Sequence, residues 1–338
     1  MDPHVRTNRL RRLAEELDEE GFGFLTGETQ TMLLTELDYA LRPPVHERRA
    51  PTYGSIVEPA HPAEAWSEPT ELTITRRPVG ELAIADARRF ADGLSSWLVR
   101  ADGTESELVV FDRAAGSERD LVVLADATGA TLIQRHPTGA VRAVGAFGVL
   151  RWNGIRWYHE PPVAAWVNTL NACGDDNHHK ILARMLEFAV HDLGSRGIGA
   201  ILVFRPREDP NATYELRLQQ PPPLQIRRTS DLAPLRHVLA QIDGAAVFDE
   251  TGTLRDLGVR LVPSVDAISL VEGYRGMRHT AGRRYSHDDP DATVIVISED
   301  GPVTVLRRGH IIGRSELERD DTPSFADEAL ALEEPDFA

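Results

Sequence analysis

The chain has 338 residues, a length typical of about two domains, and carries a formal net charge of −16 at pH 7. This acidic balance argues against a protein that holds DNA or RNA over a long stretch, whereas a small anionic ligand needs only a local basic patch. Cys173 is the single cysteine, so an intramolecular disulfide and any site built from several cysteines are excluded.

Residues 1–160 are predicted to form an α+β unit. A first helix begins at Thr7 or Asn8 and carries leucines at helical spacing, and a second runs from 28 to 41, ahead of two prolines. The Pro-, Glu- and His-rich segment that follows is predicted to be a loop over 43–70. The later elements expected in this unit are a helix at 84–99 and strands at 72–75, 108–111, 121–124, 131–134, 141–150 and 155–159.

The second half is predicted to alternate between helices and strands. Residues 161–177 form a helical linker, 178–315 form the second domain, and 316–338 form a flexible tail with nine acidic residues and one arginine. The apolar run at 200–204 is typical of a strand buried on both faces. The other expected elements are helices at 163–170, 177–193, 231–241 and 264–272, and strands at 214–218, 245–249, 255–262, 293–298 and 303–307.

No targeting segment or membrane span is predicted. Residues 1–17 are charged and lack an apolar stretch, and no run of about 18 apolar residues occurs. A single cysteine fits a reducing compartment, so we expect a cytoplasmic protein.

Two acidic turns of the second half carry candidate chemistry. Asp243-Gly244-Ala245 enters an apolar strand, so its carboxylate lies where a ligand backbone or sugar can approach closely. Ser298-Glu299-Asp300-Gly301 stands between two predicted strands. Taken alone, the first segment is more typical of a helix-to-strand turn, and the second of a plain hairpin turn.

The segment 273–284 is strongly basic within this acidic chain. Guanidinium groups suit phosphate oxygens, and glycines let backbone N–H groups approach them. A solvated basic turn paired with the aspartates of 288–291 is the alternative. The basic residues of the segment are Arg275, Arg278, His279, Arg283 and Arg284.

Taken together, the three segments resemble a known family. Asp243-Gly244-Ala245, Gly276-Met277-Arg278-His279-Thr280 and Ser298-Glu299-Asp300 follow the order and spacing of motifs in the diadenylate cyclase (DAC) domain. Its members make cyclic di-AMP from two ATP. The resemblance covers about residues 178–315 and implies a mixed β-sheet flanked by helices, hence an α+β / mixed α/β protein in which 1–160 is a sensing or regulatory module.

The resemblance also implies a mechanism. Two DAC domains face each other with one ATP each, and the 3′-hydroxyl of each ATP attacks the α-phosphate of the other, releasing two pyrophosphates. Asp243 orients the hydroxyl, and Asp243 and Glu299 bind Mg²⁺ or Mn²⁺. The catalytic residues implied are Asp243, Gly244, Ala245, Arg278 and His279. The ATP-binding residues implied are Leu261, Pro263, Gly276, Met277, Thr280, Arg283 and Ser298. The implied partners are ATP and further copies of the chain, as a homodimer or higher homo-oligomer.

Two departures from the family pattern keep other functions open. Met277 replaces a threonine, and Thr280 replaces the second arginine of the basic motif, so a degenerate DAC domain that binds ATP or cyclic di-AMP as a signal is the main alternative. A role in which the second domain only dimerises is a further one. No membrane segment and no DNA-binding helix-hairpin-helix segment is recognised. A metal-like cluster is interpreted as helix capping; its members are Cys173, Asp175, Asp176, His178 and His179.

Overall fold

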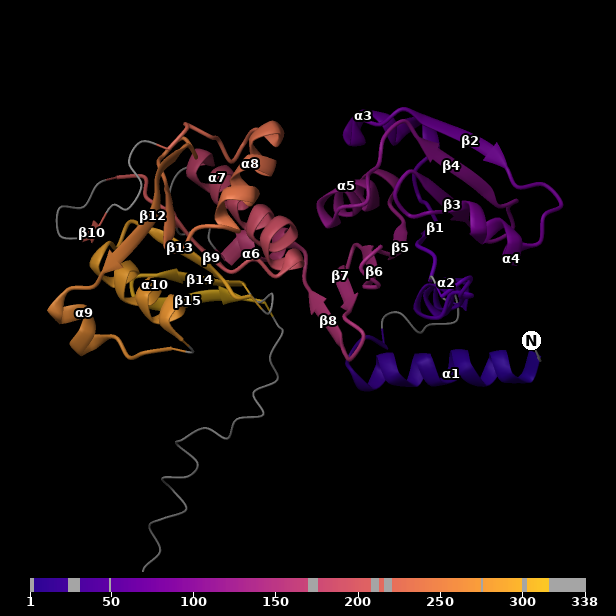
Figure 1. Cartoon of the computed structure of the whole chain (residues 1–338), viewed down its shortest axis with the longest axis horizontal. Coiled ribbons are helices and arrows are strands. Elements are labelled where there is room, and N and C mark those ends of the chain that lie inside the picture. The colour runs from indigo at the N-terminus through magenta and orange to yellow at the C-terminus, as the bar shows by residue number, and fades with distance from the viewer. Residues whose placement is uncertain are drawn as a thin grey trace, which may run out of the picture.

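The computed structural model describes residues 3–23, 31–48, 50–169, 176–207, 213–215, 221–274, 276–299 and 303–315. Their elements form two lobes, which are connected after the strand β8 (Figure 1). Each lobe is built on one mixed sheet that has a hydrophobic core on both faces. The expected mixed α/β fold, with helices flanking the sheets, is therefore confirmed.

The described part of the first lobe holds an eight-stranded sheet in the order β2-β4-β3-β1-β5-β6-β7-β8. Strands β1 and β3 run parallel, and the other neighbours run antiparallel. The strands are β1 (Tyr53–Val57), β2 (Ile74–Pro78), β3 (Ser96–Arg100), β4 (Glu107–Phe111), β5 (Thr131–Arg135), β6 (Val141–Gly145), β7 (Gly148–Trp152) and β8 (Trp157–Glu160).

Helices cover both faces of this first sheet. Side chains of α1 and α2 share one core with Leu98, while side chains of α5 share the other with Trp97. These two neighbours on β3 face opposite cores because side chains alternate along a strand. The helical segments are α1 (Pro3–Glu19), α2 (Thr31–Leu41), η3 (Ala63–Ala65), α3 (Ser67–Thr70), α4 (Ile84–Ala87), η4 (Arg88–Phe90) and α5 (Glu118–Thr128).

The second lobe contains a seven-stranded sheet, within the residues described, in the order β10-β12-β11-β9-β13-β14-β15. Only the pair β9 and β11 is parallel among its described pairings. The strands are β9 (Ala200–Phe204), β10 (Thr213–Glu215), β11 (Ala245–Phe248), β12 (Leu254–Val262), β13 (Thr293–Ile297), β14 (Val303–Arg307) and β15 (His310–Arg314).

Strand β9 lies in the middle of the second sheet and is buried on both faces, as predicted. Leu202 packs in a core with α7, η5 and α8, whereas Val203 packs in the opposite core with Tyr285 of α10. The helical segments of this lobe and its connection are α6 (Val163–Thr169), α7 (Asp176–Glu187), the π-helix η5 (Phe188–Leu193), η6 (Gly194–Arg196), α8 (Thr229–Leu239), α9 (Val265–Leu270) and α10 (Met277–Asp288).

The helix predicted over 84–99 is wrong in its second half. The helical segments end at Phe90, and β3 begins at Ser96. Between them Asp92 accepts hydrogen bonds from the backbone N–H groups of Leu94, Ser95 and Ser96 at 2.7–2.8 Å, which fixes a turn. The apolar residues 94, 97 and 98 have helical spacing by chance, because two of them belong to opposite faces of a strand.

The strand predicted at 121–124 is part of helix α5. Ser117 and Asp120 form a reciprocal capping box at its start, and Gly129 ends it in the left-handed conformation, with φ 63°. The Ser-x-x-Asp and Gly signals were present in the sequence, but the β-branched and aliphatic residues between them suggested a strand.

Other boundaries differ more locally. The loop predicted over 43–70 contains the buried strand β1 and two short helical segments, and the single strand predicted over 141–150 is the hairpin β6–β7. Helix α1 begins at Pro3, so Thr7 and Asn8 lie inside it. Helix α10 and strand β15 were not predicted. The expected tail, 316–338, lies outside the described residues.

Candidate functional site

Strand topology brings two of the singled-out segments, and the residue before β9, to one edge of the second sheet. Strand β11 runs parallel to β9, and β13 runs antiparallel to it, with Ala200 opposite Ile297 and Ile201 opposite Ala245. The residues before β9, before β11 and after β13 therefore lie at the same edge. These positions hold Gly199, Asp243 and Ser298.

A cavity of about 720 Å³ lies at this edge, between the sheet and the start of α10. It is lined by nine of the predicted site residues: Asp243, Gly244, Leu261, Gly276, Met277, Arg278, His279, Ser298 and Glu299. Its remaining lining residues are Ile201, Val259, Arg260, Ala281 and Ile297. Its size falls within the range of small-molecule and cofactor sites.

Gly244 presents Asp243 at the cavity. Its φ is 110°, a conformation that side chains rarely adopt, and a Cβ there would lie 2.6 Å from the carbonyl carbon of Gly258 on β12. A glycine is required at this position because β11 and β12 approach each other so closely. The turn thus places an exposed carboxylate immediately before a buried strand.

Helix α10 begins at the cavity with Gly276 as its N-cap. The first N–H groups of a helix have no partner within the helix and carry partial positive charge, so this end favours an anion. Arg278 adds a full positive charge, and its Nη1 lies 3.0 Å from Oε1 of Glu299. Basic and acidic groups thus meet directly inside the cavity.

Gly199 makes this pairing possible, a role that its place in the sequence does not reveal. A Cβ built on Gly199 would collide with Nη1 of Arg278 and would lie 2.8 Å from Cγ of Glu299. The ion pair therefore lies across the Cα of Gly199. The sequence signal was its place before the buried strand β9.

His279 lines the cavity but is largely buried, at 7% exposure. Its Nε2 lies 3.3 Å from Oγ1 of Thr304 on β14, and its ring packs edge-on against Tyr274. These contacts hold the ring in place at the back of the site.

Four predicted site residues do not line the cavity. Ala245 is buried in β11, and Pro263 precedes α9. Thr280 Oγ1 accepts a hydrogen bond from the backbone N–H of Tyr274 at 3.0 Å, and Arg283 donates from Nε to the carbonyl of Gly309 at 2.7 Å. Arg284 donates to the carbonyl of Val271, so neither arginine takes the place of the arginine that Thr280 replaces.

Some expected residues fall outside the described part of the chain. Arg275, Asp300, Cys173 and Asp175 belong to this group. Of the metal-like cluster, Asp176, His178 and His179 lie in the first turn of α7, where the His178 ring packs edge-on against Phe204.

The carboxylate oxygens at the cavity could hold Mg²⁺ or Mn²⁺ only together with oxygens of a bound molecule. Among the described residues, no group of three or more His, Cys, Asp or Glu side chains is arranged to hold a metal. Asp243 and Glu299 offer two carboxylates, and Mg²⁺ is often bound by one or two carboxylates together with substrate phosphates. A phosphate ligand would complete such a site.

Two segments of the chain match models of known families. Residues 187–311 match the family model described as DAC, the nucleotide-binding domain of the DisA bacterial checkpoint controller. This segment is a DAC domain. Residues 11–160 match the model described as probable sensor domain DACNK. The cavity lies within the DAC domain, and the resemblance inferred from its motifs is confirmed.

No curated protein matches the chain. Two solved structures are similar over part of it: a hypothetical membrane-spanning protein from Bacillus cereus (20% identity, 41% of this chain and 70% of that chain, TM-score 0.33) and a double mutant of DacA from Staphylococcus aureus (17% identity, 46% and 97%, TM-score 0.27). Within the described residues, every helix is too short or too polar to cross a bilayer.

Proposed function

We propose that the protein is a diadenylate cyclase, which condenses two ATP into cyclic di-AMP and two pyrophosphates. The observation that carries this proposal is the convergence of Asp243, Arg278, His279, Ser298 and Glu299 on one cavity of the DAC domain. These residues come from three separate segments of the sequence. Their chemistry suits a nucleoside triphosphate with a divalent cation.

In the proposed reaction, the oxygen of one ribose 3′-hydroxyl forms a bond to the α-phosphorus of the second ATP, and the bond to pyrophosphate breaks. The hydroxyl loses its proton, and the second linkage forms in the same way. Asp243 orients the attacking hydroxyl, while the N-terminus of α10 and Arg278 hold the triphosphate. Catalysis of this kind depends mainly on positioning and charge neutralisation.

A metal would serve the same chemistry. Asp243 and Glu299 are the residues that would hold Mg²⁺ or Mn²⁺, together with phosphate oxygens. The metal would stabilise negative charge on the phosphates. On nucleotide binding the Arg278–Glu299 pair would open, so that Arg278 would contact phosphate and Glu299 would be available as one of the residues that hold the metal.

Two copies would face each other in the active assembly. Met277 is 90% exposed at the cavity, an unusual position for a large apolar side chain. A second copy that brings its own ATP would cover this side chain. A lone protomer would then bind ATP without forming product.

The test is incubation with ATP and Mn²⁺ or Mg²⁺, followed by chromatography of the products. Wild type is expected to form cyclic di-AMP, and Asp243→Asn to lose this activity while still binding ATP. Asp291→Asn is the matched control, because Asp291 is exposed and does not line the cavity. Full activity in Asp243→Asn would refute the role of Asp243.

The second candidate is a degenerate domain that binds ATP or cyclic di-AMP as a signal. Thr280 favours it, because this residue holds the Tyr274 loop in place of an arginine that contacts phosphate. Under this function ATP binds at the same cavity and stays unchanged at every protein concentration. The same incubation therefore separates the two candidates.

A further inference from the structure

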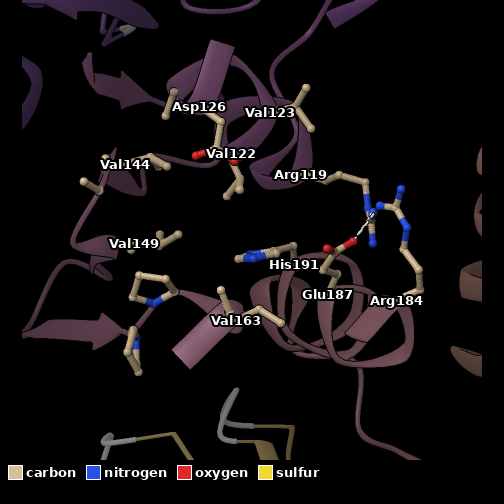
Figure 2. Close-up of a pocket in the computed structure, with 17 residues that line it drawn as sticks. Arg119, Val122, Val123, Asp126, Val144, Val149, Val163, Arg184, Glu187 and His191 are labelled. Atoms are coloured by element: carbon tan, nitrogen blue, oxygen red, sulfur yellow. Dashed lines mark hydrogen bonds and ion pairs between the residues drawn. The ribbon is translucent and has the colours of Figure 1, made fainter. Parts of the chain in front are cut away.

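A second cavity, of about 340 Å³, lies where the N-terminal lobe meets the DAC lobe (Figure 2). Residues of α5 and of the β6–β7 turn form its N-terminal side. The start of α6 and residues of α7 and η5 form the other side. It lies outside the candidate active site, since the two cavities share no lining residue.

The walls of this junction cavity are mainly apolar. Figure 2 shows Val144 and Val149 on one side and Val122 and Val163 across the space from each other. Apolar walls with few polar groups are typical of sites for small organic molecules. The volume, at the lower end of such sites, suits a compact ligand.

Asp126 is the one acidic lining residue without a partner in the described part of the chain. The other acid, Glu187, is held by Arg184 at 2.8 Å and by Arg119 at 3.4 Å. Asp126, an exposed residue, makes no hydrogen bond or ion pair with a described residue. Partial burial and the nearby negative charge of Glu187 raise the pKa of Asp126, and the nearby His191 offsets part of this rise. A positively charged ligand would therefore meet a carboxylate that has no ion-pair partner among the described residues.

His191 reaches into the cavity from η5 and supplies a second polar group (Figure 2). Its Nδ1 lies 2.9 Å from Oε1 of Glu118, a fully buried carboxylate that Arg151 also binds through two hydrogen bonds. These arginine contacts keep Glu118 ionised and lower its pKa, so Nδ1 donates to it. In the neutral ring, Nε2 is then the atom that can accept a hydrogen bond from a ligand.

We propose that the junction cavity binds a small organic cation, a primary ammonium group on a compact apolar body. The ammonium group would pair with Asp126 and donate to His191, and the apolar body would lie between the valines. An anionic ligand would meet the unpaired carboxylate of Asp126. Arg119 pairs with Asp192 and Glu187, Arg184 pairs with Glu187, and the remaining Nη2 of Arg119 is buried away from the cavity surface. A neutral ligand would leave the carboxylate without a partner.

The cavity has a direct structural route to the candidate active site. His191 belongs to the π-helix η5, a geometry often found at functional positions. The chain continues from η5 to Gly197, where a Cβ would lie 3.0 Å from the carbonyl oxygen of Glu299, and to Gly199 beneath the Arg278–Glu299 pair. A ligand on His191 would thus act on the segment that supports Glu299, a consequence that rests on the proposed function.

The test uses phenethylammonium as the probe, with 2-phenylethanol and phenylacetate as neutral and anionic controls of the same shape. Isothermal titration calorimetry on the full chain is expected to detect binding of phenethylammonium at least tenfold tighter than of either control. Asp126→Asn is expected to weaken it at least tenfold. Glu105→Gln, which removes an exposed carboxylate away from the cavity, is expected to leave it unchanged.

The outcomes separate this proposal from the cyclase proposal, because calorimetry needs no turnover. Absence of phenethylammonium binding, equal binding of the alcohol, or unchanged binding by Asp126→Asn overturns the ammonium site. Hydrogen exchange of residues 188–199 supplies the second readout, and it is expected to slow when phenethylammonium binds. Binding without that change overturns the route through η5 and leaves the site itself supported.

Discussion

Replacing Gly199 by alanine is expected to damage the proposed nucleotide site and to spare the fold. The new Cβ would collide with Nη1 of Arg278 and approach Cγ of Glu299 to 2.8 Å, so both side chains must move. They are 41% and 69% exposed, respectively, and can move without disturbing the core. The free energy of unfolding should therefore change by less than about 1 kcal/mol.

The same displacement should weaken ATP binding about tenfold, which corresponds to about 1.4 kcal/mol. Calorimetric titration with ATP and Mg²⁺, alongside urea unfolding, measures the two effects separately. Gly273→Ala is the matched control, because its Cβ would lie 3.5 Å from Thr280, an ordinary contact. Wild-type affinity in Gly199→Ala would refute the assignment of the Arg278–Glu299 pair to the site.

Three other substitutions test the framework. Gly244→Ala forces a side chain into positive φ against the backbone of Gly258. Urea unfolding should therefore show a free energy of unfolding lower by roughly 2–3 kcal/mol, and no cyclic di-AMP should form. Wild-type stability would contradict the close approach of β11 and β12. Glu118→Gln leaves Arg151 and His191 without their buried carboxylate and should lower the free energy of unfolding by about 3–5 kcal/mol at pH 7. Because folding lowers the pKa of Glu118, the stabilisation by its carboxylate is present above the pKa of the unfolded chain and is lost as pH falls through the pKa of the folded protein. The difference in free energy of unfolding between wild type and Glu118→Gln should therefore narrow in acid. A difference that stays constant from pH 7 to pH 3 would contradict this. Ser117→Ala removes the capping box of α5 and should cost about 1 kcal/mol by thermal unfolding, and no loss would argue against the cap.

The candidate site was predictable because its chemistry resides in short segments. The carboxylate of Asp243, the basic Arg278 and the acidic Glu299 were identified by type and order, and the sheet topology places all three at one cavity. Gly199 was not assigned a role, because its effect depends on side chains from two other segments. Thr280 and Arg283 point to backbone partners that no sequence pattern reveals.

The fold was predicted less evenly. Strand β9 was recognised because both its faces are apolar, which a sequence displays directly. The leucine and tryptophan spacing around Asp92 matches a helical period and so predicts a helix, whereas three backbone hydrogen bonds to the Asp92 carboxylate fix a turn. The junction cavity lay beyond prediction altogether, since its two sides come from different lobes.

The central claim is tested most directly by giving the protein an equal mixture of ordinary ATP and ATP labelled with ¹³C, and weighing the product by mass spectrometry. A diadenylate cyclase joins two ATP drawn at random, so cyclic di-AMP should appear in light, mixed and heavy forms, with the mixed form most abundant. Two pyrophosphates should accompany each product molecule. ATP that remains intact while bound, or that is converted only to mononucleotides, would contradict the claim.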